Sequence, residues 1–222
     1  MKNKHAVFPI IMAGLAFLCF LFIAFNMAIS VQPLWGKTMV LILPSLVLAF
    51  VGFLAFKGKL DARKTENLTV GLSIILVIAA FVYTIFLSVL MATTETTNVR
   101  YYTNAYKQID HKDSVKGIFP KKLPDDAEAV SFRYHPQFLQ GGELFELSYS
   151  TTADRLSDWA DHLADKAEWI GSNEEWYQTH WGYGYEEAIR YQLYWEDGNH
   201  GETAYVLIDL TQNRITFFYE DW

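Results

Sequence analysis

The stretch from Leu68 to Ala92, LTVGLSIILVIAAFVYTIFLSVLMA, decides the architecture of this chain. It runs for 25 residues without a single Asp, Glu, Lys, Arg or His. A helix rises ~1.5 Å per residue and the hydrocarbon layer of a bilayer is about 30 Å thick, so about 20 apolar residues make one crossing. The stretch is therefore predicted to be a transmembrane helix that separates the N-terminal part of the chain from the C-terminal part.

Two more apolar stretches precede it, at residues 6–25 and 38–56, and each is long enough for one crossing. Residues 1–92 are thus predicted to form a membrane domain with three transmembrane helices. Ion pathways and proton relays need ionisable groups within the membrane, and none lies in any of the three stretches. The helices are expected to act as an anchor. The only cysteine, Cys19, lies within the first stretch, so an intrachain disulfide is excluded.

Basic residues in the short loops predict the orientation. The N-terminal segment has Lys2 and Lys4, and the loop between the second and third stretches has Lys57, Lys59, Arg63 and Lys64. The loop between the first and second stretches has only one basic residue, Lys37. Positive loops stay in the cytoplasm, so the N-terminus is predicted inside and residues 93–222 outside. A cleaved signal peptide over residues 1–30 stays open as an alternative, and it leaves the rest of the topology unchanged.

The two halves of the chain carry opposite charge. Residues 1–92 have a net charge of +5 and residues 93–222 a net charge of −12. An acidic domain repels phosphates, so nucleic acid is not expected as a partner. An external domain without disulfides fits a bacterium better than a eukaryotic secreted protein. The predicted localisation is a bacterial cell membrane, with several crossings.

The external half is predicted to begin with a polar connector at residues 93–117 and to continue as an α+β domain at residues 118–222. Alternating apolar residues predict strands, and a 3.6-residue period predicts one helix. The expected elements are strands at 128–135 and 143–150, a helix at 152–170, and strands at 187–196, 203–210 and 214–221. This order, ββαβββ, indicates an antiparallel sheet with one helix packed on it. Whether the connector continues the third membrane helix is left open.

The run from Ile118 to Tyr149, IFPKKLPDDAEAVSFRYHPQFLQGGELFELSY, resembles a stretch found in uncharacterised membrane-anchored proteins of Gram-positive bacteria. The resemblance covers 32 residues and implies a bacterial plasma membrane. It implies no activity, no cofactor and no functional residue.

Aromatic and acidic residues are concentrated in residues 169–195. Aromatic faces beside carboxylates can hold a sugar, a peptide or a cation. The candidate ligand-binding residues are Trp176, Tyr177, Trp181, Tyr183 and Tyr185, with Glu174 and Glu175. Packing of these aromatics in the core is the alternative interpretation.

The sequence also offers candidates for two other chemistries. Asp158, His162 and Asp165 share a helix face with the spacing of divalent-metal ligands, although a solvated helix face has the same pattern. A glycan hydrolase needs two carboxylates held about 5–9.5 Å apart, and the adjacent pairs 174–175 and 186–187 are candidates for them. No cofactor is expected.

The sequence thus favours a membrane-anchored extracytoplasmic binding or sensing domain that is not catalytic. Its expected partners are the lipid bilayer and a membrane or cell-wall component. A membrane subunit of a larger complex and a surface glycan hydrolase remain alternatives.

Overall fold

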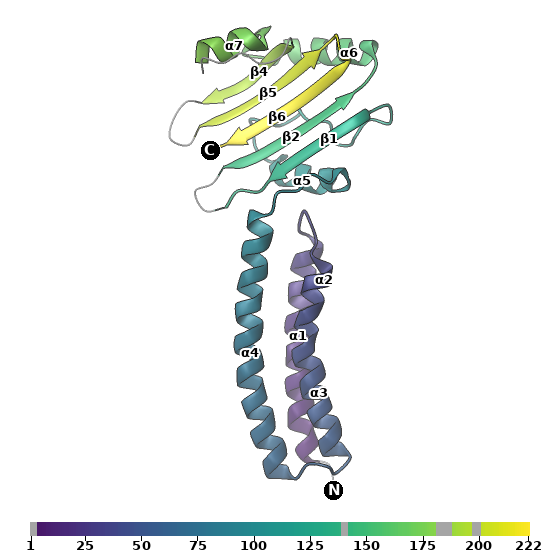
Figure 1. The fold of residues 1–222 in the computed structure, drawn as a ribbon, viewed down its shortest axis with the longest axis vertical. Helices are drawn as coiled ribbons and strands as arrows, with labels where there is room; N and C mark the ends of the chain where they lie inside the picture. Colours follow the sequence, from purple (N-terminus) through teal and green to yellow (C-terminus); the bar gives the residue numbers. More distant parts are fainter. Residues whose placement is uncertain (1–3, 139–141, 181–187, 197–200) are drawn as a thin grey trace. The chain divides into compact units, whose positions relative to one another are not determined.

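The computed structural model describes residues 4–138, 142–180, 188–196 and 201–222, with side chains in the helix that ends at His180 described only as far as Trp176 (Figure 1). The chain divides into two compact units, Met1–Met91 and Ala92–Trp222.

The first unit is helical. Its elements are η1 (Lys4–Ala6), α1 (Val7–Ala28), α2 (Trp35–Thr38), η2 (Met39–Ile42), α3 (Leu43–Phe56) and α4 (Ala62–Thr93). Three continuous helical segments are long and apolar enough to cross a membrane, at Lys4–Ala28, Trp35–Phe56 and Ala62–Thr93. All three predicted helices are therefore confirmed, and most of their large apolar side chains are exposed, as expected of surfaces that face lipid.

Close contact between α1 and α3 depends on small residues. A Cβ atom added at Gly52 of α3 would lie 2.9 Å from Cγ1 of Ile10 in α1. The Ser45 hydroxyl also donates to the Ala13 carbonyl oxygen at 3.0 Å. Small residues and interhelical hydrogen bonds of this kind hold helices together where the hydrophobic effect cannot. The third helix, α4, joins them through an apolar cluster whose buried members are Phe20, Leu41 and Leu87.

The second unit contains a six-stranded antiparallel sheet in the order β1-β2-β6-β5-β4-β3. Its elements are η3 (Val99–Tyr101), α5 (Tyr102–Ile109), β1 (Glu128–His135), β2 (Glu143–Ser150), α6 (Ala153–Ala164), β3 (Trp169–Ser172), α7 (Asn173–His180), β4 (Ile189–Glu196), β5 (Glu202–Asp209) and β6 (Arg214–Asp221). The predicted strands at 128–135, 143–150 and 214–221 agree with β1, β2 and β6 at both ends, and that at 203–210 is displaced from β5 by one residue.

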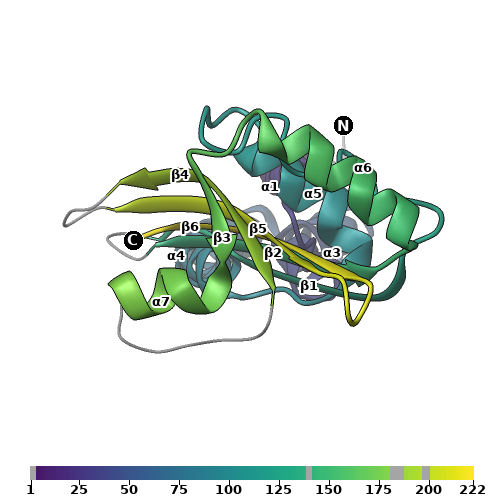
Figure 2. The ribbon, with the colours of Figure 1, turned by 90° about the horizontal axis from the view of Figure 1, so that it is seen from above.

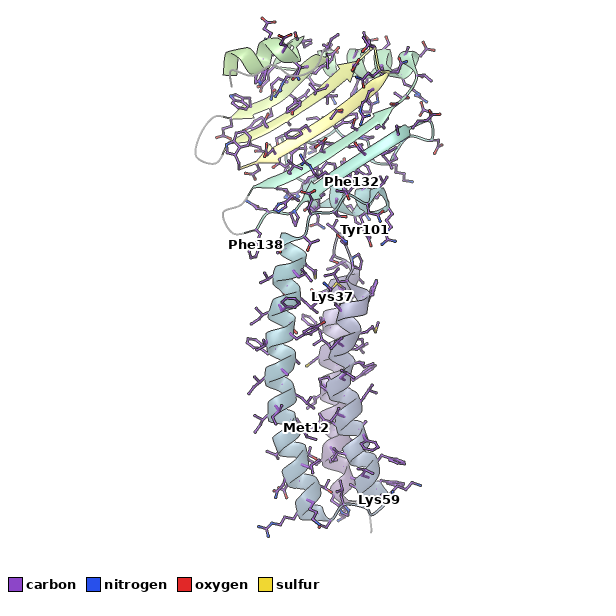
Figure 3. All side chains as sticks on the ribbon, viewed as in Figure 1. Met12, Lys37, Lys59, Tyr101, Phe132 and Phe138 are labelled. Atoms are coloured by element: carbon purple, nitrogen blue, oxygen red, sulfur yellow. The ribbon has the colours of Figure 1, made fainter. Side chains whose placement is uncertain are left out.

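Helices lie on both faces of this sheet. Figure 2 shows α5 and α6 on one face and α7 on the other. The first face is the apolar core, where Phe145 and Leu147 of β2 and Phe217 of β6 are fully buried. Phe132 of β1, labelled in Figure 3, completes it by an edge contact with Tyr102 of α5, with ring centroids 5.6 Å apart. Alternating side chains thus build this core, in agreement with the period-two pattern.

The predicted helix at residues 152–170 is too long. Its beginning is confirmed, because the Thr152 side chain caps α6 by accepting from the Arg155 amide at 3.4 Å. The helix ends at Ala164, and residues 169–172 form β3 at the edge of the sheet, paired with β4. The helical spacing places Ile170 on the apolar helix face, yet this residue is 45% exposed in the strand. Backbone pairing with β4 overrides the helical spacing here.

The predicted order ββαβββ is wrong for the same reason. The observed order after α5 is ββαβαβββ, with β3 and α7 added between α6 and β4. Gly171 lies within β3, where it provides space: a Cβ atom there would lie 2.5 Å from the Trp169 ring. The expectation of one helix on the sheet fails with it.

The connector at residues 93–117 is part of the second unit. Helix α4 ends at Thr93, and Thr96 then pairs with Tyr134 at the edge of β1 through two backbone hydrogen bonds of 2.9 Å. In α5, Tyr102, Tyr106 and Ile109 are buried. Their spacing of four and three residues is that of an apolar helix face, which packs α5 against the sheet.

A buried network holds the end of the connector to the sheet. The Lys112 ammonium lies 2.9 Å from a Glu143 carboxylate oxygen and 3.1 Å from Asp221. It donates to the Tyr219 hydroxyl at 2.5 Å, while the Tyr134 hydroxyl donates to Glu143 at 2.9 Å. Burial works to lower the pKa of Lys112, but the hydrogen bonds with Tyr219 and Glu143 outweigh it and raise that pKa. Lys112 is therefore charged at neutral pH.

We expect Lys112→Met to lower the free energy of unfolding by about 3–5 kcal/mol, because it leaves the Glu143 carboxylate buried without its cation. Six of the seven tryptophans lie in residues 92–222, so urea unfolding of the full chain followed by tryptophan fluorescence reports on this domain. The control is Lys116→Met, which removes an exposed lysine four residues away. Equal effects of both substitutions would show that the network contributes nothing specific.

Candidate functional site

A cleft of about 740 Å³ opens on the second unit beside helix α6. We name it the α6 cleft. One wall is the segment 124–126 that precedes β1, and the other is the exposed side of α6; Tyr149 and Thr151, at the end of β2, lie between them. The side chains from α6 are Arg155, Asp158, Trp159 and His162, together with the N-cap Thr152. Its volume is in the range of small-ligand sites in proteins.

The amphipathic character of α6 positions these side chains. Leu156 and Leu163 are fully buried against the sheet. Trp159, which shares their side of the helix, is half-buried, with its ring 5.0 Å from that of Phe217 in an edge-to-face contact. One edge of the indole is therefore anchored in the core while the rest of it lines the cleft. Arg155 and Asp158 project from the solvent-exposed side.

Tyr149 is the most deeply buried residue of the cleft, at 1% exposure. Its ring packs against Phe217, with centroids 6.0 Å apart. Its hydroxyl is buried, and within the described ranges no acceptor lies in hydrogen-bonding geometry with it. A buried donor without an acceptor costs about 1–3 kcal/mol.

The protonation of Tyr149 follows from this burial. Burial raises the pKa of Tyr149 to about 12, against a smaller lowering by the nearby Trp159 indole. The indole N–H can only donate, so it cannot accept the proton of the Tyr149 hydroxyl. At neutral pH the group is therefore a hydroxyl donor that lacks an acceptor.

The carboxylate of Asp126 is held in place by neighbours on both sides. It accepts a hydrogen bond from the Thr151 hydroxyl at 2.8 Å and lies 3.7 Å from the Arg155 guanidinium. These contacts, the Thr151 hydrogen bond first and the Arg155 charge after it, lower the pKa of Asp126. Arg155 is also 4.0 Å from Asp158. The guanidinium therefore lies between two carboxylates.

The three candidate metal ligands, Asp158, His162 and Asp165, are not grouped around one site. Asp158 lies beside Arg155, whereas the His162 ring nitrogen Nε2 is 2.9 Å from the Lys166 ammonium, which can only donate. Asp165 is the C-cap of α6 and is exposed. In the ranges that the structure describes, no three His, Cys, Asp or Glu side chains are grouped to hold a metal ion.

The aromatic segment is divided by the fold. The sequence leaves two interpretations open for Trp176 of α7, a ligand surface or packing in the core, and it is only 6% exposed. Its ring packs on Trp169 and Trp195, with centroids 5.1 and 5.8 Å away, and 4.6 Å from the Arg190 guanidinium. Trp176 is thus a packing residue on the second face of the sheet, where the apolar area of its ring outweighs any gain from exposure.

The other members of that segment have different places. Glu174 and Glu175 are exposed in the first turn of α7. Tyr177 belongs to α7, but its side chain lies outside the described part of the structure, as do all of Trp181, Tyr183 and Tyr185. The carboxylates at 186 and 187 also lie outside it.

The chain matches no protein-family model, no curated protein and no solved structure. The functional assignment therefore depends on the geometry of the site.

We expect Tyr149→Phe to raise the free energy of unfolding by about 1 kcal/mol, because it removes a buried hydroxyl that has no acceptor. The matched control is Tyr134→Phe, which removes a buried hydroxyl that donates to Glu143. The control should lower the free energy of unfolding by about 1.5–3 kcal/mol. Urea titration followed by tryptophan fluorescence measures both, and a comparable loss in the two variants would mean that Tyr149 is paired in solution.

Proposed function

We propose that this protein is a membrane-anchored binding protein of the bacterial cell membrane. Its N-terminus is cytoplasmic, its C-terminal domain lies outside the cell, and the α6 cleft binds a ligand there without chemical turnover. The observation that carries the proposal is the buried hydroxyl of Tyr149, which lacks a hydrogen-bond acceptor, in a cleft of about 740 Å³. A protein that leaves a buried donor unpaired loses stability, and such losses are concentrated at functional sites.

The charge distribution along the helical unit supports the orientation. Figure 3 labels Lys37 near one end of that unit and Lys59 near the other. The end with Lys59 also includes Lys57, Arg63 and Lys64. Loops rich in Lys and Arg are retained in the cytoplasm, and an odd number of crossings then takes residues 92–222 to the outside.

The properties of the carboxylates support binding over hydrolysis. A general acid needs a carboxyl group that stays protonated near neutral pH, which requires a raised pKa. The hydrogen bond from Thr151 and the charge of Arg155 lower the pKa of Asp126, so it is ionised at neutral pH. Such a carboxylate can accept hydrogen bonds and attract cations, which are the properties of a binding site.

The orientation predicts which introduced cysteine a membrane-impermeant maleimide can reach. In a Cys19→Ser background, Lys107→Cys lies in the C-terminal domain and Lys59→Cys in the second loop; both positions are exposed. On intact protoplasts we expect labelling of the first variant, and labelling of the second only after permeabilisation. The reverse pattern would place the domain in the cytoplasm and end the proposal.

Ligand binding is tested by thermal melting of the full chain in nanodiscs, with and without a soluble muramidase digest of bacterial cell wall. A ligand at 100 times its Kd stabilises the folded state by about 2.7 kcal/mol, so the wild-type melting temperature should rise by several degrees. Tyr149→Phe should weaken binding about fivefold, the loss of one hydrogen bond, and so reduce this stabilisation to about 1.8 kcal/mol at the same ligand concentration.

Tyr134→Phe should keep the rise, because its ring lies outside the cleft although it is also buried, in the neighbouring strand. A rise of the same size in all three proteins would locate binding elsewhere. A wild-type protein that does not respond would remove wall fragments as ligands of the cleft.

A further inference from the structure

The charges around the α6 cleft are unequal. Three carboxylates line it, those of Asp125, Asp126 and Asp158, against the single guanidinium of Arg155, so these four side chains have a net charge of −2. The Arg155 guanidinium is already shared between Asp126 and Asp158, at 3.7 and 4.0 Å. An anionic ligand would therefore meet carboxylates and no available cation, while a cationic ligand would be attracted.

Asp125 and Asp158 are the carboxylates best placed to meet a ligand cation. Both are exposed at the rim of the cleft, and Asp125 belongs to none of the ion pairs found in the described ranges. Asp126, in contrast, is engaged by Thr151 and Arg155 and serves to hold the two walls together.

The deeper part of the cleft favours a different kind of ligand group, a hydrogen-bond acceptor. The Tyr149 hydroxyl needs a hydrogen-bond acceptor, and a neutral carbonyl or hydroxyl oxygen supplies one without adding a negative charge beside the carboxylates. Trp159 also lines the cleft and is half-buried. Its indole surface attracts either an ammonium group or the apolar face of a sugar.

We propose that the α6 cleft binds a ligand with a protonated primary amine close to a neutral hydrogen-bond acceptor. The amine lies at the rim between Asp125 and Asp158, and the acceptor receives the Tyr149 hydroxyl. Two sources have this chemistry: a de-N-acetylated glucosamine unit of a glycan and a lysine-type side chain of a peptide. This inference rests on the proposed function, because it specifies the ligand of the same cleft.

Matched pairs of probes test the amine. Calorimetric titrations use the full chain in nanodiscs of neutral lipid with four probes: the glucosamine tetrasaccharide and its N-acetylated form, and the peptide Gly-Lys-Gly, blocked by Nα-acetylation and C-terminal amidation, and its Nε-acetylated form. We expect one of the two amine probes to bind, and its acetylated counterpart to bind at least tenfold more weakly. The pair that shows the difference identifies the source.

Matched variants test the location. The double substitution Asp125→Asn with Asp158→Asn should weaken binding of the amine probe about tenfold, since each exposed ion pair contributes up to about 1 kcal/mol and 1.4 kcal/mol is a factor of ten. Tyr149→Phe should weaken it about fivefold, the loss of one hydrogen bond. The control is Asp154→Asn with Asp161→Asn, which removes the same charge from exposed positions of the same helix outside the cleft.

Each other outcome overturns the inference in a distinguishable way. Equal binding of amine and acetylated probes would exclude the amine, and equal weakening by the two double variants would reduce the effect to general attraction by an acidic surface. If no amine probe binds but wall fragments still stabilise the protein through Tyr149, the ligand class is wrong and the proposed function stands. If neither responds, both are wrong.

Discussion

The buried charge of Glu143 at the start of β2 holds the elements of the C-terminal domain together. The residue is 6% exposed, and a buried carboxylate without partners costs several kcal/mol. Lys112 and Tyr134 meet it from two directions, at 2.9 Å each. Because Lys112 follows α5 and Tyr134 lies in β1, the same interaction holds both elements to β2. The position of α5 over the aromatic core, and of the chain that leads into the 124–126 segment, depends on it.

At the opposite end of the same strand, a buried polar group lacks a hydrogen-bond acceptor. Tyr149, six residues along β2 from Glu143, is buried just as deeply, but its hydroxyl meets no acceptor in the described part of the chain. At the other end of the core, the same domain pairs the Tyr134 hydroxyl with the Glu143 carboxylate. Thr151 and Asp126 line the same cleft and bond each other at 2.8 Å. The donor without an acceptor therefore lies at the cleft.

Local sequence pattern predicts the helices and strands whose structure depends mainly on their own residues. Alternating apolar residues place β1 and β2 correctly because each strand has one face in the core. The same kind of pattern misses the end of α6, because residues 165–170 continue a helical spacing while pairing with β4 makes residues 169–172 a strand. Helix α5 has a readable signal in Tyr102, Tyr106 and Ile109, although the polar residues around them are typical of a connector.

Local sequence pattern does not predict the α6 cleft. Asp126 and Tyr149 are 23 residues apart and approach one another only when the chain before β1 passes the end of β2. Aromatic density instead favours residues 169–195, where Trp176 packs in the core. Composition reports how many aromatic rings a segment has, but only tertiary structure shows which of them are exposed. Burial of a polar atom without a partner, which identifies Tyr149, has no signature in sequence at all.

The composition of the α6 cleft also bears on why a binding domain of this kind would be anchored. The cleft is open and its charged groups are exposed, so each contact at the rim contributes at most about 1 kcal/mol and one deep hydrogen bond adds a similar amount. A single site of this type binds weakly. If the ligand is a polymer with repeated units, such as a glycan, then copies confined to one membrane bind it as linked weak sites, which gain about 10²–10⁴ in avidity without any new contact. Three crossings then matter for binding as well as for location, because they turn a weak cleft into one component of a multivalent surface.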